Sequence, residues 1–220
     1  MFVSYILQLP ILIPSQPSSP SADDDPSRHS RTDPKLNHDA TLIAYVRQRD
    51  LWITSIEGDM RLTFCADQTA DRTRSCGTVE YLMQEEFHRY TGYDWGPPLA
   101  SSADTCIQRI LYLETTEADV DVVVIKNASP SCHHPSNRPS DAVDSVRYPR
   151  AGRHNAVSDL CIVEFIPHQQ RSLVHRKLDI RAYFPWTEYI VRFGWMPHGH
   201  RYVLPTGEYY ALDMLSWDII

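Results

Sequence analysis

Residues 42–64 read LIAYVRQRDLWITSIEGDMRLTF. Three short runs of apolar, β-branched and aromatic residues, 42–46, 51–56 and 60–64, are separated here by two polar turns. Short runs of this kind joined by tight polar turns are typical of a β-meander, and no helical apolar stripe fits them. The stretch therefore predicts three consecutive antiparallel strands.

The same texture returns further along the chain, which predicts an all-β protein. A Pro/Gly turn at 195–200 stands between two expected strands, and this is a blade-type repeat signal. The fold expected is a partial β-propeller of about three or four four-stranded blades, with a short helical insertion. An acidic turn at 117–119 is expected to join the first two of the later strands. The later strands are expected at 107–114, 120–126, 157–165, 178–184, 188–194 and 201–204.

The chain is expected to have three parts. Residues 1–38 form a disordered leader, because the Pro-, Ser-, Asp- and Arg-rich part of this stretch cannot bury enough surface to offset its ordering entropy. Residues 39–204 form the partial propeller, and residues 205–220 are an unassigned tail. The apolar start, 1–14, is too short to span a bilayer and lacks a basic beginning, so it reads as a stray start, with a signal peptide as the alternative.

Charge and cysteine usage exclude several classes of protein. The net charge is −7 and the basic residues are scattered, so a nucleic-acid-binding face is not expected. Five cysteines at irregular spacings favour reduced thiols in a cytoplasmic protein over a disulfide scaffold. No metal is expected, because the neighbouring ligands of Cys132-His133-His134 cannot close a tetrahedral shell unaided. No cofactor is expected either, since the sequence has no phosphate-cradling Gly-rich loop.

Residues 81–95, YLMQEEFHRYTGYDW, interrupt the strand rhythm and carry the adjacent acids Glu85 and Glu86. Glu and Gln favour a brief helical turn here, which Gly92 would end. The repulsion between two converging carboxylates must be offset by a cation. A peptide's α-amino group suits that position, because its pKa of about 7.7–8.0 keeps it largely protonated and it offers three donors.

This segment closely resembles the double-glutamate segment of the dipeptidyl peptidase IV family, and it is most similar to the cytosolic dipeptidyl peptidase 8/9 branch. The resemblance runs from about Asp33 to Leu204 in the expected order. It is carried by residues 84–95, by 50–53 through 61–65, by 109–112, by 144–145 with 147–152 and Asn155, and by 188–195.

The resemblance implies an eight-bladed propeller that caps an α/β-hydrolase domain, and release of Xaa-Pro or Xaa-Ala dipeptides from peptide N-termini. It implies that Glu85 and Glu86 anchor the substrate's α-amine, and that Arg89 and Tyr93 belong to a segment that orders when ligand binds. The family usually has Asp and Trp where this chain has His88 and Asp94, which puts the ordering transition in doubt more than the amine site. Compared with the family, residues 166–177 look shortened, as though a strand were missing.

The chain lacks the family's catalytic machinery. None of its eight glycines flanks a serine in a Gly-x-Ser-x-Gly elbow, so we expect the chain alone to be inactive. The first hypothesis is an N-terminal propeller fragment of a dipeptidyl peptidase, with peptide N-termini and the missing hydrolase domain as partners and a homodimer as the full-length form. The alternative is a non-catalytic propeller remnant that binds peptides or proteins.

Overall fold

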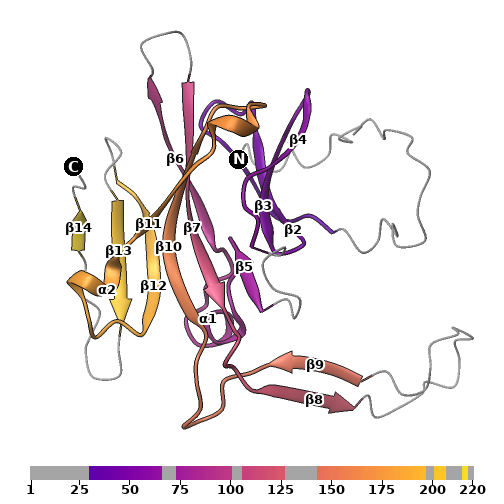
Figure 1. The fold of residues 1–220 in the computed structure, drawn as a ribbon, viewed down its shortest axis with the longest axis vertical. Helices are drawn as coiled ribbons and strands as arrows, with labels where there is room; N and C mark the ends of the chain where they lie inside the picture. The colour runs from indigo at the N-terminus through magenta and orange to yellow at the C-terminus, as the bar shows by residue number, and fades with distance from the viewer. Residues whose placement is uncertain are drawn as a thin grey trace, which may run out of the picture. The chain divides into compact units, whose positions relative to one another are not determined.

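The computed structural model describes residues 30–65, 73–100, 106–126, 143–196, 201–206 and 215–217. The chain divides into Met1–Ser30 and Arg31–Ile220, and only the second unit is described below. This unit is built of antiparallel sheets with few helical turns, which confirms the all-β prediction (Figure 1). Neither described α-helix has the length or apolar character that a bilayer crossing requires.

The first sheet is a four-stranded meander in the order β1-β2-β3-β4. Its strands are β1 (Thr32–Leu36), β2 (Ile43–Arg47), β3 (Asp50–Ser55) and β4 (Gly58–Arg61). The last three confirm the meander expected in residues 42–64. Gln48 and Arg49 both have positive φ (51° and 69°), as the tight turn between β2 and β3 requires.

Strand β1 corrects the expected leader, which was placed at residues 1–38. Its pairing with β2 is irregular between Thr32 and Lys35, and Pro34 lies within the irregularity. An edge strand tolerates a proline and a bulge, because one of its sides needs no ladder hydrogen bonds. Residues 32–36 are therefore an edge strand and not part of a disordered leader.

The second sheet is centred on the long strand β7 (Cys106–Thr116). One edge of β7 pairs with β10 (Val157–Phe165), and β10 in turn pairs with β11 (Val174–Leu178). The other edge is shared end to end by β6 (Tyr93–Ala100) and β5 (Arg74–Cys76) (Figure 1). The strands predicted at 107–114 and 157–165 are confirmed.

Two expectations about this part of the chain were wrong. No strand is missing from residues 166–177, because β11 lies there after a 3-10 turn at Gln170–Ser172. The strand expected at 178–184 is instead the helix α2 (Ile180–Tyr183), which Asp179 caps by accepting from the Ala182 N–H.

The strand predicted at 120–126 is β8 (Val122–Lys126), which pairs with β9 (Val143–Arg147) rather than folding back on β7. Both edges of β7 are already occupied, so β8 has no free ladder to join there.

The third sheet has the order β12-β13-β14. Its strands are β12 (Tyr189–Trp195), β13 (Arg201–Thr206) and β14 (Leu215–Trp217), so the strands predicted at 188–194 and 201–204 are confirmed. Residues 215–217, which were expected in an unassigned tail, extend this sheet.

Two hydrophobic clusters lie on opposite faces of β7. Ile110 and Tyr112 belong to the cluster shared with the first sheet, and Leu111 and Leu113 to the cluster shared with α2 and β12. This alternation follows from the two-residue period of a strand. Sheets that pack face to face through such shared clusters form the partial β-propeller that the sequence predicts.

Candidate functional site

The expected helical insertion is α1 (Tyr81–Glu85), in the connection from β5 to β6. Glu80 caps its beginning, since its carboxylate accepts from the main-chain N–H groups of Leu82 (2.6 Å) and Met83 (3.1 Å). Met83 is buried and anchors the helix to the core. Glu80 is itself buried, and its desolvation raises the pKa of the carboxyl in spite of the two hydrogen bonds.

Glu85 and Glu86 end the helix as its last residue and its C-cap. Both residues are exposed, and no described residue forms a hydrogen bond or ion pair with either carboxylate. The end of a helix carries partial negative charge, so two acids at this place gain nothing from the helix itself. They are available to a cation from outside the chain.

The segment that follows the acids is fastened to β12 by two arginines. Arg89 is buried and donates from Nη1 to the Ile190 carbonyl at 3.0 Å, and its guanidinium lies 4.0 Å from the centre of the Phe193 ring. Arg192 reaches in the opposite direction and donates to the Phe87 carbonyl at 2.6 Å. Sequence reasoning missed Arg192, because a contact across 105 residues leaves no local signal.

Tyr93 is buried on the other side of this segment. Its hydroxyl donates to the Ala44 carbonyl at 2.9 Å, and it also bonds the Asp33 carbonyl. Burial raises the pKa of Tyr93 above its ordinary value. In this structure Arg89 and Tyr93 hold the fold together. Their expected part in ligand-induced ordering stays a prediction.

The two positions that depart from the family pattern lie in the same segment. His88 is exposed and has a positive φ of 49°. Asp94 is half-buried, and burial raises the pKa of its carboxyl. Both side chains line a cavity of about 320 Å³ together with Lys35 and Arg192.

A second cavity, of about 740 Å³, borders the beginning of α1. Glu80 and Tyr81 line it from the helix side, and Arg147 lines it from β9. Glu85 and Glu86 line neither of these cavities. The structure therefore keeps the acids adjacent at the surface, and does not itself enclose them.

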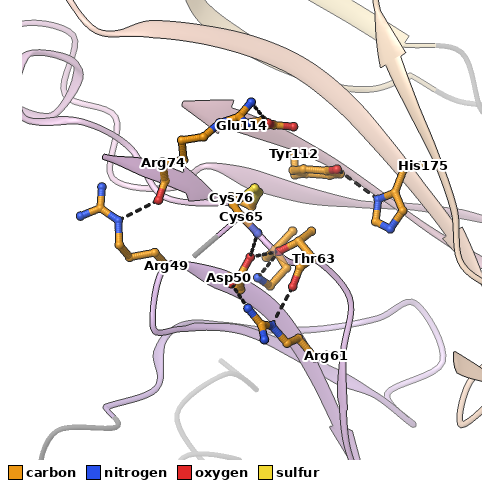
Figure 2. Close-up of a disulfide and its surroundings, with 11 residues drawn as sticks. Arg49, Asp50, Arg61, Thr63, Cys65, Arg74, Cys76, Tyr112, Glu114 and His175 are labelled. Atoms are coloured by element: carbon orange, nitrogen blue, oxygen red, sulfur yellow. Dashed lines mark hydrogen bonds and ion pairs between the residues drawn. A yellow bond between two sulfur atoms is a disulfide. The ribbon is translucent and has the colours of Figure 1, made fainter. Parts of the chain in front are cut away.

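A disulfide joins Cys65, which follows β4, to Cys76 at the end of β5 (Figure 2). This corrects the expectation that all the cysteines are reduced thiols. That expectation rested on count and spacing, and two cysteines can meet in space whatever their spacing. Within the described part of the chain, Cys106 and Cys161 are not disulfide-bonded.

Asp50 lies beside the disulfide and completes the one group of metal-ligating side chains found among the described residues. Its carboxylate accepts from Arg61 (2.6 Å), from the Thr63 hydroxyl (2.7 Å) and from the Cys65 N–H (2.8 Å) (Figure 2). With the sulfurs bonded to each other and the carboxylate engaged, this group is not arranged to hold a metal. Cys132, His133 and His134 lie outside the described residues.

Comparison with known proteins gives consistent results. The family described as "Dipeptidyl peptidase IV (DPP IV) N-terminal region" matches residues 14–206. Human dipeptidyl peptidase 8 is 31% identical over 196 residues, and the mouse protein of the same name is 30% identical over 196 residues. Each match covers 84% of this chain and 21% of the relative, so the chain spans about a fifth of the length of these relatives.

A solved structure shares the fold. The crystal structure of Porphyromonas gingivalis dipeptidyl peptidase 4 matches with a TM-score of 0.57 and 15% sequence identity, over 80% of this chain and 22% of that one. At this level of identity the likeness supports the propeller architecture alone.

Proposed function

Since the chain belongs to the dipeptidyl peptidase IV family and matches its N-terminal region, we propose that it supplies the substrate-amine anchor of a serine-type dipeptidyl peptidase. The proposed substrates are peptides with Pro or Ala second from the N-terminus, and the proposed reaction releases the N-terminal dipeptide. The observation that carries the proposal is the exposed pair Glu85 and Glu86 in the family's double-glutamate segment, neither of which has a partner among the described residues.

The chemistry of the pair suits an ammonium ion. A protonated α-amine offers three donors, enough to bond both carboxylates at once. Each charge-assisted hydrogen bond contributes about 1.5–3 kcal/mol, with the lower end expected for exposed acids. N-acetylation of the peptide removes the charge and two of the donors, so the pair would select for free N-termini.

The backbone behind the acids supports this role. The contact of Arg89 with β12, and that of Arg192, on β12, with the Phe87 carbonyl, fix the turn that follows Glu86, so the acids stand on a defined main chain. A fixed acid pair loses less conformational freedom on binding than a mobile one. The cytoplasmic location, the homodimer and the hydrolase-domain partner expected from the sequence stay part of this proposal.

The test uses the 220-residue chain and a Gly-Pro-Gly peptide amide with a free N-terminus. Binding is followed by NMR chemical-shift changes or by calorimetry. Glu85→Gln and Glu86→Gln should each weaken binding by about tenfold. Asp119→Asn, which neutralises an exposed acid in the turn after β7, is the matched control and should leave binding unchanged. Unaltered affinity in both glutamate variants would overturn the amine-anchor assignment.

A second candidate function is a peptide- or protein-binding module without catalysis. It is favoured by one feature of the sequence, the lack of a Gly-x-Ser-x-Gly elbow in these 220 residues. Because the chain alone is expected to be inactive in either case, dipeptide release is assayed on the full-length protein: a dipeptidyl peptidase would release the dipeptide, and a binding module would hold the peptide and leave it intact.

A further inference from the structure

The disulfide between Cys65 and Cys76 lies where the first sheet meets the second. The two Cα atoms are 6.2 Å apart, within the ordinary range for a disulfide, and the cysteines are 11 residues apart in sequence. Both side chains are buried, with 3% and 0% of their surface exposed. The bond therefore links two sheets through the interior.

Short contacts surround the bond and form one joint with it (Figure 2). The Cys76 N–H donates to the Arg49 carbonyl at 2.8 Å, and Arg49 Nε donates to the Arg74 carbonyl at 2.9 Å. On the other side, Asp50 accepts from the Cys65 N–H. The main-chain N–H of each cysteine is thus hydrogen-bonded to Arg49 or Asp50, where the β2–β3 turn ends and β3 begins.

The joint continues into α1, the helix that carries Glu85 and ends at Glu86, and which is called the acidic helix below. Gly77 follows Cys76, and its N–H donates to the Leu113 carbonyl at 2.8 Å. A side chain at Gly77 would meet the Leu51 side chain at 2.6 Å, so the main chain passes close against β3 here. Glu80 then caps α1. A shift of Cys76 would move the start of the helix that bears Glu85 and Glu86.

We propose that Cys65 and Cys76 are a redox modification site, a reversible dithiol–disulfide pair whose oxidised form fastens the acidic helix to the first sheet. Formation of the bond removes two electrons and two protons from the thiols. A small-molecule disulfide such as oxidised glutathione takes them up, and its own S–S bond breaks to give two thiols. The reverse exchange with a small thiol restores the dithiol.

Any effect of the pair on amine recognition rests on the proposed function of Glu85 and Glu86, but the covalent link does not. Because both sulfurs are buried, thiol–disulfide exchange requires the joint to open. The pair should therefore react with a thiol or disulfide slowly, at a rate set by local opening. Closing a loop of this length lowers the equilibrium population of the open state by about a hundredfold. Reduction of the disulfide should raise that population by the same factor.

The experiment compares the 220-residue chain in oxidised glutathione with the same chain in dithiothreitol. Alkylation after denaturation should spare two of the five cysteines in the oxidised sample and none in the reduced one. Tryptic digestion of the oxidised sample should yield residues 62–72 linked to residues 75–89.

Hydrogen exchange then measures the fastening. The amides of Gln84, Glu86 and Arg89 donate within and just after α1, and their exchange should quicken by up to about a hundredfold on reduction. Cys161→Ala removes a buried cysteine outside the pair and should keep the full response. The double variant Cys65→Ala/Cys76→Ala should exchange like the reduced chain and ignore the reductant.

Two results would overturn the proposal: alkylation of all five cysteines after oxidation, or a linked pair whose reduction leaves exchange in 81–92 unchanged. If the double variant does not fold, the oxidised and reduced wild-type samples still decide the matter. Loss of peptide binding in Glu85→Gln would not alter this exchange response, so the two proposals fail separately.

Discussion

Arg89 either stabilises the fold or takes part in ligand binding, and replacing it by alanine tests which role it plays. Its side chain donates to the carbonyls of Thr91 (2.8 Å), Ile190 (3.0 Å) and, more weakly, Val191 (3.4 Å), and it stacks on Phe193. Only 6% of its surface is exposed, so water cannot replace these contacts unless the segment after α1 separates from β12.

The expected loss follows from these contacts. A hydrogen bond from a charged donor contributes about 1.5–3 kcal/mol, and a desolvated cation–π contact about 2 kcal/mol more. Because these contributions overlap, we expect Arg89→Ala to lower the free energy of unfolding by about 3–4 kcal/mol. Arg89→Lys keeps the charge but cannot span the same carbonyls, and should lose about half as much.

Urea unfolding followed by tryptophan fluorescence measures the effect. Arg150→Ala is the control, because Arg150 forms an exposed ion pair with Asp121 at 2.8 Å whose removal should change stability by less than about 1 kcal/mol. If Arg89→Ala were as stable as this control, Arg89 would not hold the fold together. It would then be available for the ligand-dependent role that the family resemblance implies.

Two further predictions concern Glu80 and Gly77, which precede α1 in the chain. Burial raises the pKa of Glu80, so the folded state binds its proton more tightly than the unfolded state does. The stability that this group contributes is complete below about pH 4 and is lost as the pH rises through the folded pKa. The stability of the wild type relative to Glu80→Gln, measured by urea unfolding, should therefore fall from pH 4 to pH 7, and a rise would contradict the assignment. Gly77→Ala combines a positive φ (76°) with a contact at 2.6 Å to Leu51, and should lower the free energy of unfolding by more than about 2 kcal/mol in the same assay. Gly58→Ala has a positive φ but open space, so an equal loss in both variants would show that the contact does not matter.

The parts of the fold that the sequence predicted are those with local patterns. The meander at 42–64 was predictable because its runs and turns alternate within a few residues. Strand β1 was missed because Pro34 and its polar neighbours resemble a linker, and only its pairing with β2 reveals it. Residues 180–183 form a helix because Asp179 caps them, a local signal that the β-favouring side chains within 178–184 outweighed in the prediction.

The candidate site divides in the same way. Glu85 and Glu86 were identified from residues beside them in the sequence, and the structure places them as exposed acids at the end of a helix. Arg192 and the Cys65–Cys76 pair were not identified, because each depends on two segments meeting in space. Contacts of that kind follow from the packing of the sheets and not from any local pattern.

The central claim is that the exposed acid pair recognises a peptide's α-amine, and one ratio tests it most directly. The dissociation constant of the wild-type chain is measured for a Gly-Pro-Gly peptide amide and for its N-acetylated counterpart, in the same buffer at pH 7. We predict that the free amine binds at least about tenfold more tightly, since acetylation removes the charge and two of the three donors. Equal affinity for the two peptides would contradict the claim.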